Sequence, residues 1–147
     1  MTRYAIDAPT AIRLVREGVT VAGEHQLVAP NVLRSQALSL LYRQARRGEI
    51  TKAEARALLD GITTMRIRLL GDRVSRAVAW RLAEQLDWDD TVTAEYVAVA
   101  QLQADAFVTL DPQLARRVEG VVTLAPFEAL LSPAQAGGKD RIAEGGG

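Results

Sequence analysis

A short apolar segment, an acid and a helix start follow one another in the sequence Ala106-Phe107-Val108-Thr109-Leu110-Asp111-Pro112-Gln113-Leu114-Ala115-Arg116-Arg117. Val108 and Leu110 favour one face of a strand and Phe107 fills the other, which is typical of a strand covered on both faces. Asp111 is a favoured N-cap residue, and the proline after it suits the first turn of a helix. The sequence therefore predicts a strand that ends just before Asp111. This acid either only caps the helix or also lies at the edge of an open α/β sheet where ligands bind.

The same arrangement occurs at the start of the chain. Residues 4–6 are apolar, Asp7 follows them, and a helix is expected over about 8–17. If the two strands are parallel neighbours, Asp7 and Asp111 meet at one edge of the sheet. Two carboxylates there repel each other unless a proton or a cation lies between them, and carboxylate oxygens suit Mg²⁺. The sequence therefore predicts a metal site held by Asp7 and Asp111.

Helices and strands are expected to alternate along the rest of the chain. The expected helices cover about 30–47, 51–65, 72–86 and 93–104, with strands over 66–70 and 121–124 and a brief apolar stretch over 26–30. Helical spacing places Val74, Val78 and Leu82 on a buried face. Such alternation implies a three-layer α/β/α sandwich with a central, mostly parallel sheet. We predict one domain over residues 1–131 and a disordered tail over 132–147, where apolar periodicity ends.

The composition excludes several classes of protein. The chain of 147 residues carries 18 basic and 18 acidic side chains, so no overall charge attracts nucleic acid. It has no cysteine, which excludes disulfides, thiolate nucleophiles and cysteine-based zinc sites. Because neither a signal-like N-terminus nor an apolar run of membrane-spanning length is present, we expect a cytoplasmic protein without membrane contact.

Arginines and tryptophans are the remaining residues of interest for nucleic acid. Arginines gather around residues 43–47, 66–81 and 116–117, and they form either ordinary solvated helix faces or a surface that follows RNA. We interpret Trp80 and Trp88 as core or interface anchors rather than base-stacking platforms. Neither group of residues identifies a function without further evidence.

Three stretches together resemble the PIN-domain family. They are Tyr4-Ala5-Ile6-Asp7-Ala8-Pro9-Thr10; Leu27-Val28-Ala29-Pro30 with Leu33-Arg34-Ser35-Gln36-Ala37-Leu38; and Ala94-Glu95-Tyr96-Val97-Ala98-Val99-Ala100 through Phe107-Val108-Thr109-Leu110-Asp111. Their order and spacing are most similar to VapC toxins, the ribonucleases of bacterial toxin–antitoxin pairs. The resemblance covers residues 3–125. It implies a PIN-like fold, hydrolysis of RNA with Mg²⁺ or Mn²⁺, a small VapB-like antitoxin as partner, and a homodimer.

The resemblance implies four acids around the metal, and this chain departs from that pattern at two positions. Asp7 and Asp111 match the first and last acids, whereas Gln36 falls on the expected glutamate and Thr93 on the third acid. In these places Gln36 would orient water at the metal, and Thr93 would orient water or a phosphate oxygen. Alternatively, Gln36 is a hydrogen-bonded core amide and Thr93 a helix-start residue with a structural hydroxyl.

These departures leave two functions open. Two neutral residues reduce the charge of the site from about −4 to about −2, which weakens metal binding. Two nearby acids could replace the missing third acid only if the chain bends suitably. They are Asp90, about one turn before Thr93, and Glu95, two residues after it. The leading hypothesis is a VapC-like metal-dependent endoribonuclease toxin with full, reduced or no activity. The alternative is a non-catalytic PIN module that retains antitoxin or partner binding.

Overall fold

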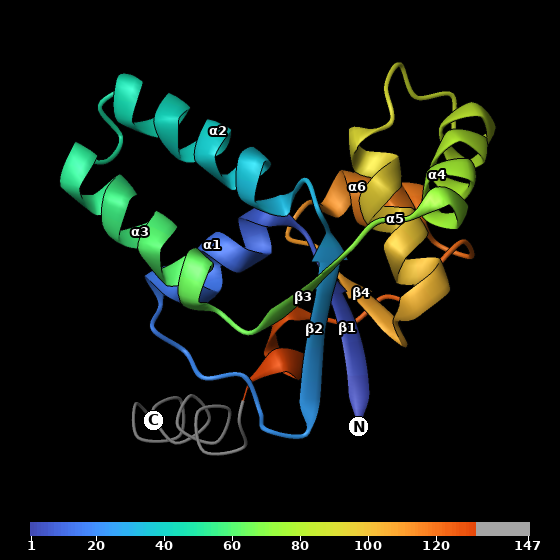
Figure 1. Ribbon diagram of the computed structural model, residues 1–147, viewed down its shortest axis with the longest axis horizontal. Helices are drawn as coiled ribbons and strands as arrows, with labels where there is room; N and C mark the ends of the chain where they lie inside the picture. Colours follow the sequence, from blue (N-terminus) through green and yellow to red (C-terminus); the bar gives the residue numbers. More distant parts are fainter. Residues whose placement is uncertain (132–147) are drawn as a thin grey trace, which may run out of the picture.

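A parallel sheet lies between two layers of helices in the computed structural model, which describes residues 1–131 (Figure 1). The strand order is β3-β2-β1-β4, and all three strand pairs are parallel. The strands are β1 (Thr2–Ile6), β2 (His25–Pro30), β3 (Ile67–Leu70) and β4 (Ala106–Val108). The predicted tail over 132–147 lies outside the described residues.

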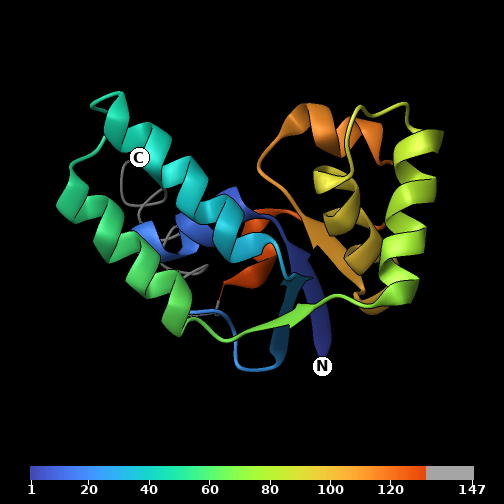
Figure 2. The ribbon, with the colours of Figure 1, turned by 45° about the horizontal axis from the view of Figure 1, so that its top comes forward.

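Helices cover both faces of this sheet. They are α1 (Ala8–Arg16), α2 (Leu33–Arg46), α3 (Lys52–Thr64), α4 (Arg73–Gln85), α5 (Val92–Gln103), α6 (Pro112–Arg117) and the 3₁₀ helix η1 (Phe127–Leu130). In Figure 2, α1, α2 and α3 lie on one side of the sheet, and α4 and α5 lie on the other. The predicted three-layer α/β/α architecture with a parallel sheet is therefore confirmed. None of the helices between residues 1 and 131 has the length and apolar character that crossing a bilayer requires.

The core lies on both faces of the sheet, and two apolar residues expected there are exposed. Ile6, Val28 and Phe107 are buried, as a doubly covered parallel sheet requires. Val74, however, is 58% exposed, because α4 packs on α5 rather than on the sheet and only its α5-facing side is covered. Leu110 is 36% exposed, because β4 already ends at Val108.

The strand expected over 121–124 forms only a single bridge to the edge of the sheet, between Leu124 and Phe107. The Phe107 N–H donates to the carbonyl of Thr123 at 2.8 Å, and the Ala125 N–H donates to the carbonyl of Phe107 at 3.0 Å. No longer ladder forms, since the chain turns just before, where the N–H groups of residues 121 and 122 both donate to the carbonyl of Val118. The sheet is thus extended beyond β4 by one bridge instead of a fifth strand.

Gly61 allows α1 and α3 to approach closely. A Cβ atom at this position would lie 2.3 Å from Cγ1 of Val15, well inside van der Waals contact. Val15 is β-branched and has little rotamer freedom in a helix, so it cannot move aside cheaply. The glycine is therefore needed for packing, even though glycine disfavours the interior of a helix.

Candidate functional site

Asp7 follows the last residue of β1 and caps α1. Its side chain is only 7% exposed. Oδ1 accepts hydrogen bonds from the Thr10 N–H at 3.0 Å and the Thr10 hydroxyl at 2.5 Å, and Oδ2 accepts the Thr109 hydroxyl at 2.7 Å. Hydrogen bonds to an ionised carboxylate are among the stronger ones in proteins. The Asp7 carboxylate is therefore held in one orientation at the carboxyl edge of the sheet.

Asp111 lies beyond β4 and caps α6 with its exposed side chain. Its Oδ1 accepts the backbone N–H groups of Gln113 at 2.9 Å and Leu114 at 3.3 Å. The predicted role of Asp111 as a helix N-cap is therefore confirmed. Its other predicted role, as a ligand-binding acid at the edge of the sheet, depends on how close Asp7 lies.

The two acids are brought to the same place by the pairing of β1 with β4. Ile6 is the register partner of Val108, so Asp7 and Thr109 leave the sheet side by side. The Thr109 hydroxyl donates to Oδ2 of Asp7 and accepts the backbone N–H of Asp111 at 3.2 Å. One hydroxyl group thus links the carboxylate of Asp7 to the backbone of Asp111 at the carboxyl edge of the sheet.

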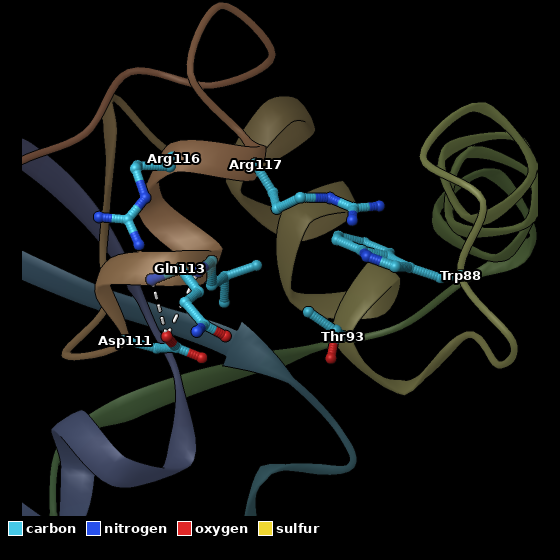
Figure 3. A pocket seen from close by; sticks show the side chains of 7 residues that line it. Trp88, Thr93, Asp111, Gln113, Arg116 and Arg117 are labelled. Atoms are coloured by element: carbon cyan, nitrogen blue, oxygen red, sulfur yellow. Dashed lines mark hydrogen bonds between the residues drawn. The ribbon is translucent and has the colours of Figure 1, made fainter.

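Thr93 and Asp111 line a single cavity of about 550 Å³. Thr93 is half-buried in the first turn of α5. In Figure 3, Thr93 and Trp88 lie on one side of this cavity, and Asp111 and Gln113 lie on the other. The rest of the wall is formed by Leu114, Arg116 and Arg117. Of the four candidate residues, Thr93 and Asp111 therefore share this cavity, whereas Asp7 does not line it and neighbours Asp111 through Thr109.

Gln36 lies in the first turn of α2, just beyond the carboxyl end of β2. Its Oε1 atom is buried and has no hydrogen-bond partner among the described residues. A core amide that served packing alone would have a donor at this oxygen. No hydrogen bond described for residues 1–131 joins Gln36 to Asp7 or Asp111. Gln36 thus presents an unused acceptor and is hydrogen-bonded to neither acid.

Neither proposed substitute for the third acid lines the cavity that Thr93 shares with Asp111. Asp90 is exposed, and its Oδ1 accepts the Val92 N–H at 3.1 Å at the start of α5. Glu95 is half-buried and lines a separate cavity of about 290 Å³ beyond the ends of β2 and β3. The third acid therefore has no direct replacement in that cavity.

Two residues that influence Asp7 were not predicted from the sequence. They are Thr109, which donates a hydrogen bond to Asp7, and Tyr96, whose pKa responds to its charge. Tyr96 is 3% exposed, and its hydroxyl has no hydrogen-bond partner among residues 1–131. Burial raises the pKa of Tyr96 well above its ordinary value, and the negative charges of Asp7 and Glu95 raise it further. The signal for Tyr96 was its position one turn after Thr93 on α5. The signal for Thr109 was its position directly after β4, level with Asp7.

The donor set fits a divalent cation that keeps most of its water. Residues 1–131 contain no group of three or more His, Cys, Asp or Glu side chains placed to hold a metal ion. Mg²⁺, however, often uses only one or two protein carboxylates and retains several waters. Oδ2 of Asp7 accepts one hydrogen bond and Oδ2 of Asp111 accepts none from residues 1–131, so both oxygens have free lone pairs. Each residue thus offers an oxygen donor of the kind that Mg²⁺ prefers.

The fold is shared with solved structures, although no protein-family model and no curated protein sequence matches this chain. The crystal structure of PAE2754 from Pyrobaculum aerophilum superposes with a TM-score of 0.69 at 21% identity, covering 88% of this chain and 92% of that one. VapBC2 from Rickettsia felis, bound to a DNA fragment from its promoter, gives a TM-score of 0.62 at 10% identity, covering 84% and 98%. At such low identity the similarity shows the fold alone, and it supports the predicted PIN-like architecture.

Proposed function

We propose that this chain is a VapC-like endoribonuclease that uses Mg²⁺ or Mn²⁺, with Asp7 and Asp111 as the metal ligands. The observation that carries this proposal is the Thr109 hydroxyl, which bonds the carboxylate of Asp7 and the backbone N–H of Asp111 at the carboxyl edge of the sheet. Ligands bind at this edge in open α/β folds. The shared fold with the VapBC2 complex further supports a toxin-like nuclease.

The four candidate residues would have distinct roles toward RNA. A divalent cation, when bound, would supply positive charge that stabilises the phosphate in the transition state and lowers the pKa of water. Asp7 would offer a rigid ligand because three hydrogen bonds hold it, and exposed Asp111 would offer a second ligand on the cavity side. Gln36 would accept a hydrogen bond from water through its unused Oε1, and the Thr93 hydroxyl would orient water or a phosphate oxygen.

RNA cleavage by the purified chain tests the proposal. We expect cleavage of single-stranded RNA with Mg²⁺ or Mn²⁺ and none with EDTA. Asp7→Asn and Asp111→Asn should each reduce the rate at least about a hundredfold, because each removes half of the site's negative charge. Asp60→Asn, an exposed acid on α3, is the matched control and should cleave like the unaltered chain. Cleavage that survives Asp7→Asn would overturn the proposal.

The second candidate function is a non-catalytic module that binds a partner. The absence of a third acidic ligand from the part of the chain that the structure describes favours it. The Rickettsia felis structure is a VapBC2 complex, and by analogy the partner would be a small VapB-like antitoxin. A chain that forms a stable complex with such an antitoxin but cleaves no RNA with either metal would establish this alternative.

Sedimentation equilibrium of the chain alone tests the proposed homodimer.

A further inference from the structure

The cavity beside Asp111 has an aromatic and cationic wall that the proposed metal site does not use. Trp88 is half-buried and lines the cavity together with the exposed side chains of Arg116 and Arg117. Among residues 1–131, neither arginine has a carboxylate within salt-bridge distance. Two unpaired cations and one carboxylate, Asp111, give the wall a net positive charge. A cavity of about 550 Å³ lies within the usual range for small-ligand sites, about 300–1,000 Å³.

The backbone holds Trp88 in place at the end of α4. Asp87 has a left-handed conformation with φ 57°, which Asp tolerates better than most residues. The Trp88 N–H donates to the carbonyl of Ala83 at 2.9 Å, and the Asp87 N–H donates to the carbonyl of Glu84 at 3.2 Å. This pair of bonds is the Schellman motif that closes a helix. Trp88 is therefore presented to the cavity from a fixed position.

Arg117 is held in place by the same end of α4. Its guanidinium carbon lies 5.9 Å from the centroid of the Trp88 ring, and Nη2 donates to the carbonyl of Leu86. Figure 3 shows the Arg117 side chain extending from α6 above the Trp88 ring. The contact with Leu86 caps α4 and uses one of the five N–H donors of the guanidinium. The other donors are free for a ligand, and a side chain that is already fixed loses less entropy on binding.

We propose that this cavity binds a nucleotide of single-stranded RNA, with the base against Trp88 and the phosphate at Arg117. This role for Trp88 replaces the interpretation from the sequence, in which Trp88 was a core or interface anchor. Proteins that bind single strands combine stacking aromatic side chains with a positively charged groove, and arginine recognises phosphate with paired donors. An acidic peptide would use the arginines but would not need the flat ring of Trp88 beside Arg117. This inference rests on the proposed function, since the nucleotide would neighbour the one whose phosphate reaches Asp111.

Salt-dependent binding without metal tests the phosphate contact. The probe is a short fluorescein-labelled oligouridylate in EDTA, so cleavage plays no part. Arg117→Ala should weaken binding about tenfold and reduce the slope of log Kd against log salt by about 0.7, as expected for one lost phosphate contact on a single strand. Arg56→Ala removes an exposed arginine from distant α3 and should change neither quantity. If Arg117→Ala behaves like Arg56→Ala, the proposal is wrong.

Fluorescence tests the base contact. The chain has two tryptophans, so Trp80→Phe leaves Trp88 as the single reporter. Oligouridylate should quench its emission. Trp88→Phe should retain binding within about threefold, whereas Trp88→Leu, which keeps an apolar side chain without a ring, should lose about tenfold. Thermal midpoints of the variants establish that they are folded. Bound RNA that leaves Trp88 emission unchanged would overturn the base contact.

The two proposals can fail separately in these experiments. RNA binding that depends on Arg117 without any cleavage would overturn the nuclease and retain the nucleotide site. Cleavage and binding that are indifferent to Arg117 and Trp88 would overturn the nucleotide site and retain the nuclease. A chain that binds polyglutamate through Arg117 but binds no oligouridylate would show that the cavity accepts an acidic peptide, and would overturn the RNA assignment.

Discussion

Thr109 donates its hydroxyl proton to Oδ2 of Asp7 at 2.7 Å while its oxygen accepts the backbone N–H of Asp111 at 3.2 Å. One side chain thus orients a buried acid and fixes the backbone of an exposed one. Neither acid has to reach across the sheet, because parallel pairing of β1 with β4 brings all three residues to one edge. The geometry of the proposed metal site therefore depends on a residue that is not an acid.

Thr109→Val should disturb both acids while it preserves the shape of the side chain. We expect a loss of about 1–2 kcal/mol in the free energy of unfolding, because the substitution removes a hydrogen bond to a charged acceptor. Metal affinity and RNA cleavage should fall as well, since Asp7 loses one of three restraints. Urea denaturation and metal titration by calorimetry measure the effects. Thr123→Val, at an exposed position, is the control, and an equal effect of both substitutions would contradict this role of Thr109.

Tyr96→Phe should change the stability of the protein most at alkaline pH. The folded state raises the pKa of Tyr96, chiefly through burial and also through the charges of Asp7 and Glu95. Below the unfolded pKa of about 10 both states keep the proton; above it the unfolded chain releases the proton first, so stability is lost as pH rises. Tyr96→Phe should remove this component of alkaline unfolding.

The same substitution also tests the unpartnered hydroxyl at neutral pH. Removing a buried hydroxyl without a hydrogen-bond partner should raise the free energy of unfolding by about 1 kcal/mol. Urea denaturation at neutral pH and at several alkaline pH values measures both effects. Tyr42→Phe is the matched control, since Tyr42 is 59% exposed. Parallel pH profiles for the two variants would show that the Tyr96 phenol does not titrate differently in the folded state.

Gly61→Ala should destabilise the protein, although alanine favours helix more than glycine does by about 1 kcal/mol. The new methyl group would meet Cγ1 of Val15 at 2.3 Å, and overpacking of this kind costs about 1–3 kcal/mol. Val15→Ala in the same chain should recover most of the loss by removing the clash. Thermal denaturation of the single and double variants measures this coupling. If the loss of stability in the double variant equals the sum of the losses in the two single variants, close packing at this point is contradicted.

Local patterns in the sequence were sufficient for the elements that place the two acids. At β1–α1 and at β4–α6, a short apolar strand, an acid and a nearby proline follow one another, and both acids are N-caps. The hydroxyl that links them was not predictable in this way. Thr109 and Asp7 are 102 residues apart, and only the register of β1 against β4 makes them neighbours. A pattern within one segment carries no information about that register.

Burial was predicted less well where a helix packs on another helix. Spacing of apolar residues on α4 gave the buried positions Val78 and Leu82 correctly but also included Val74, which is exposed. Periodicity identifies which face of the helix is apolar. How much of that face is buried depends on the partner, which here is α5. The candidate site shows the same limit. Gln36 and Thr93 were placed by resemblance, and only Thr93 lines a cavity with Asp111.

Gln36→Glu should strengthen metal binding, because it changes the charge at this position and almost nothing of the shape. The buried Oε1 of Gln36 has no hydrogen-bond partner among the described residues, so no donor there would compensate an added negative charge in place of a cation. Coulomb attraction to a divalent cation should outweigh the repulsion from Asp7 and Asp111, and charge count tunes such carboxylate sites. We expect about a tenfold gain in Mg²⁺ affinity, measured by calorimetry, together with faster RNA cleavage.

The control for this change adds the same charge elsewhere on the fold. Gln103 is exposed at the far end of α5, about 15 Å along the helix from Thr93. Since the Debye length is about 10 Å at 0.1 M salt, Gln103→Glu should leave metal affinity unchanged. A gain in affinity without a gain in cleavage would favour the non-catalytic module. Unchanged affinity with a loss of stability would mean that Gln36 serves the core, because a buried carboxylate without a cation costs free energy that the neutral amide avoids.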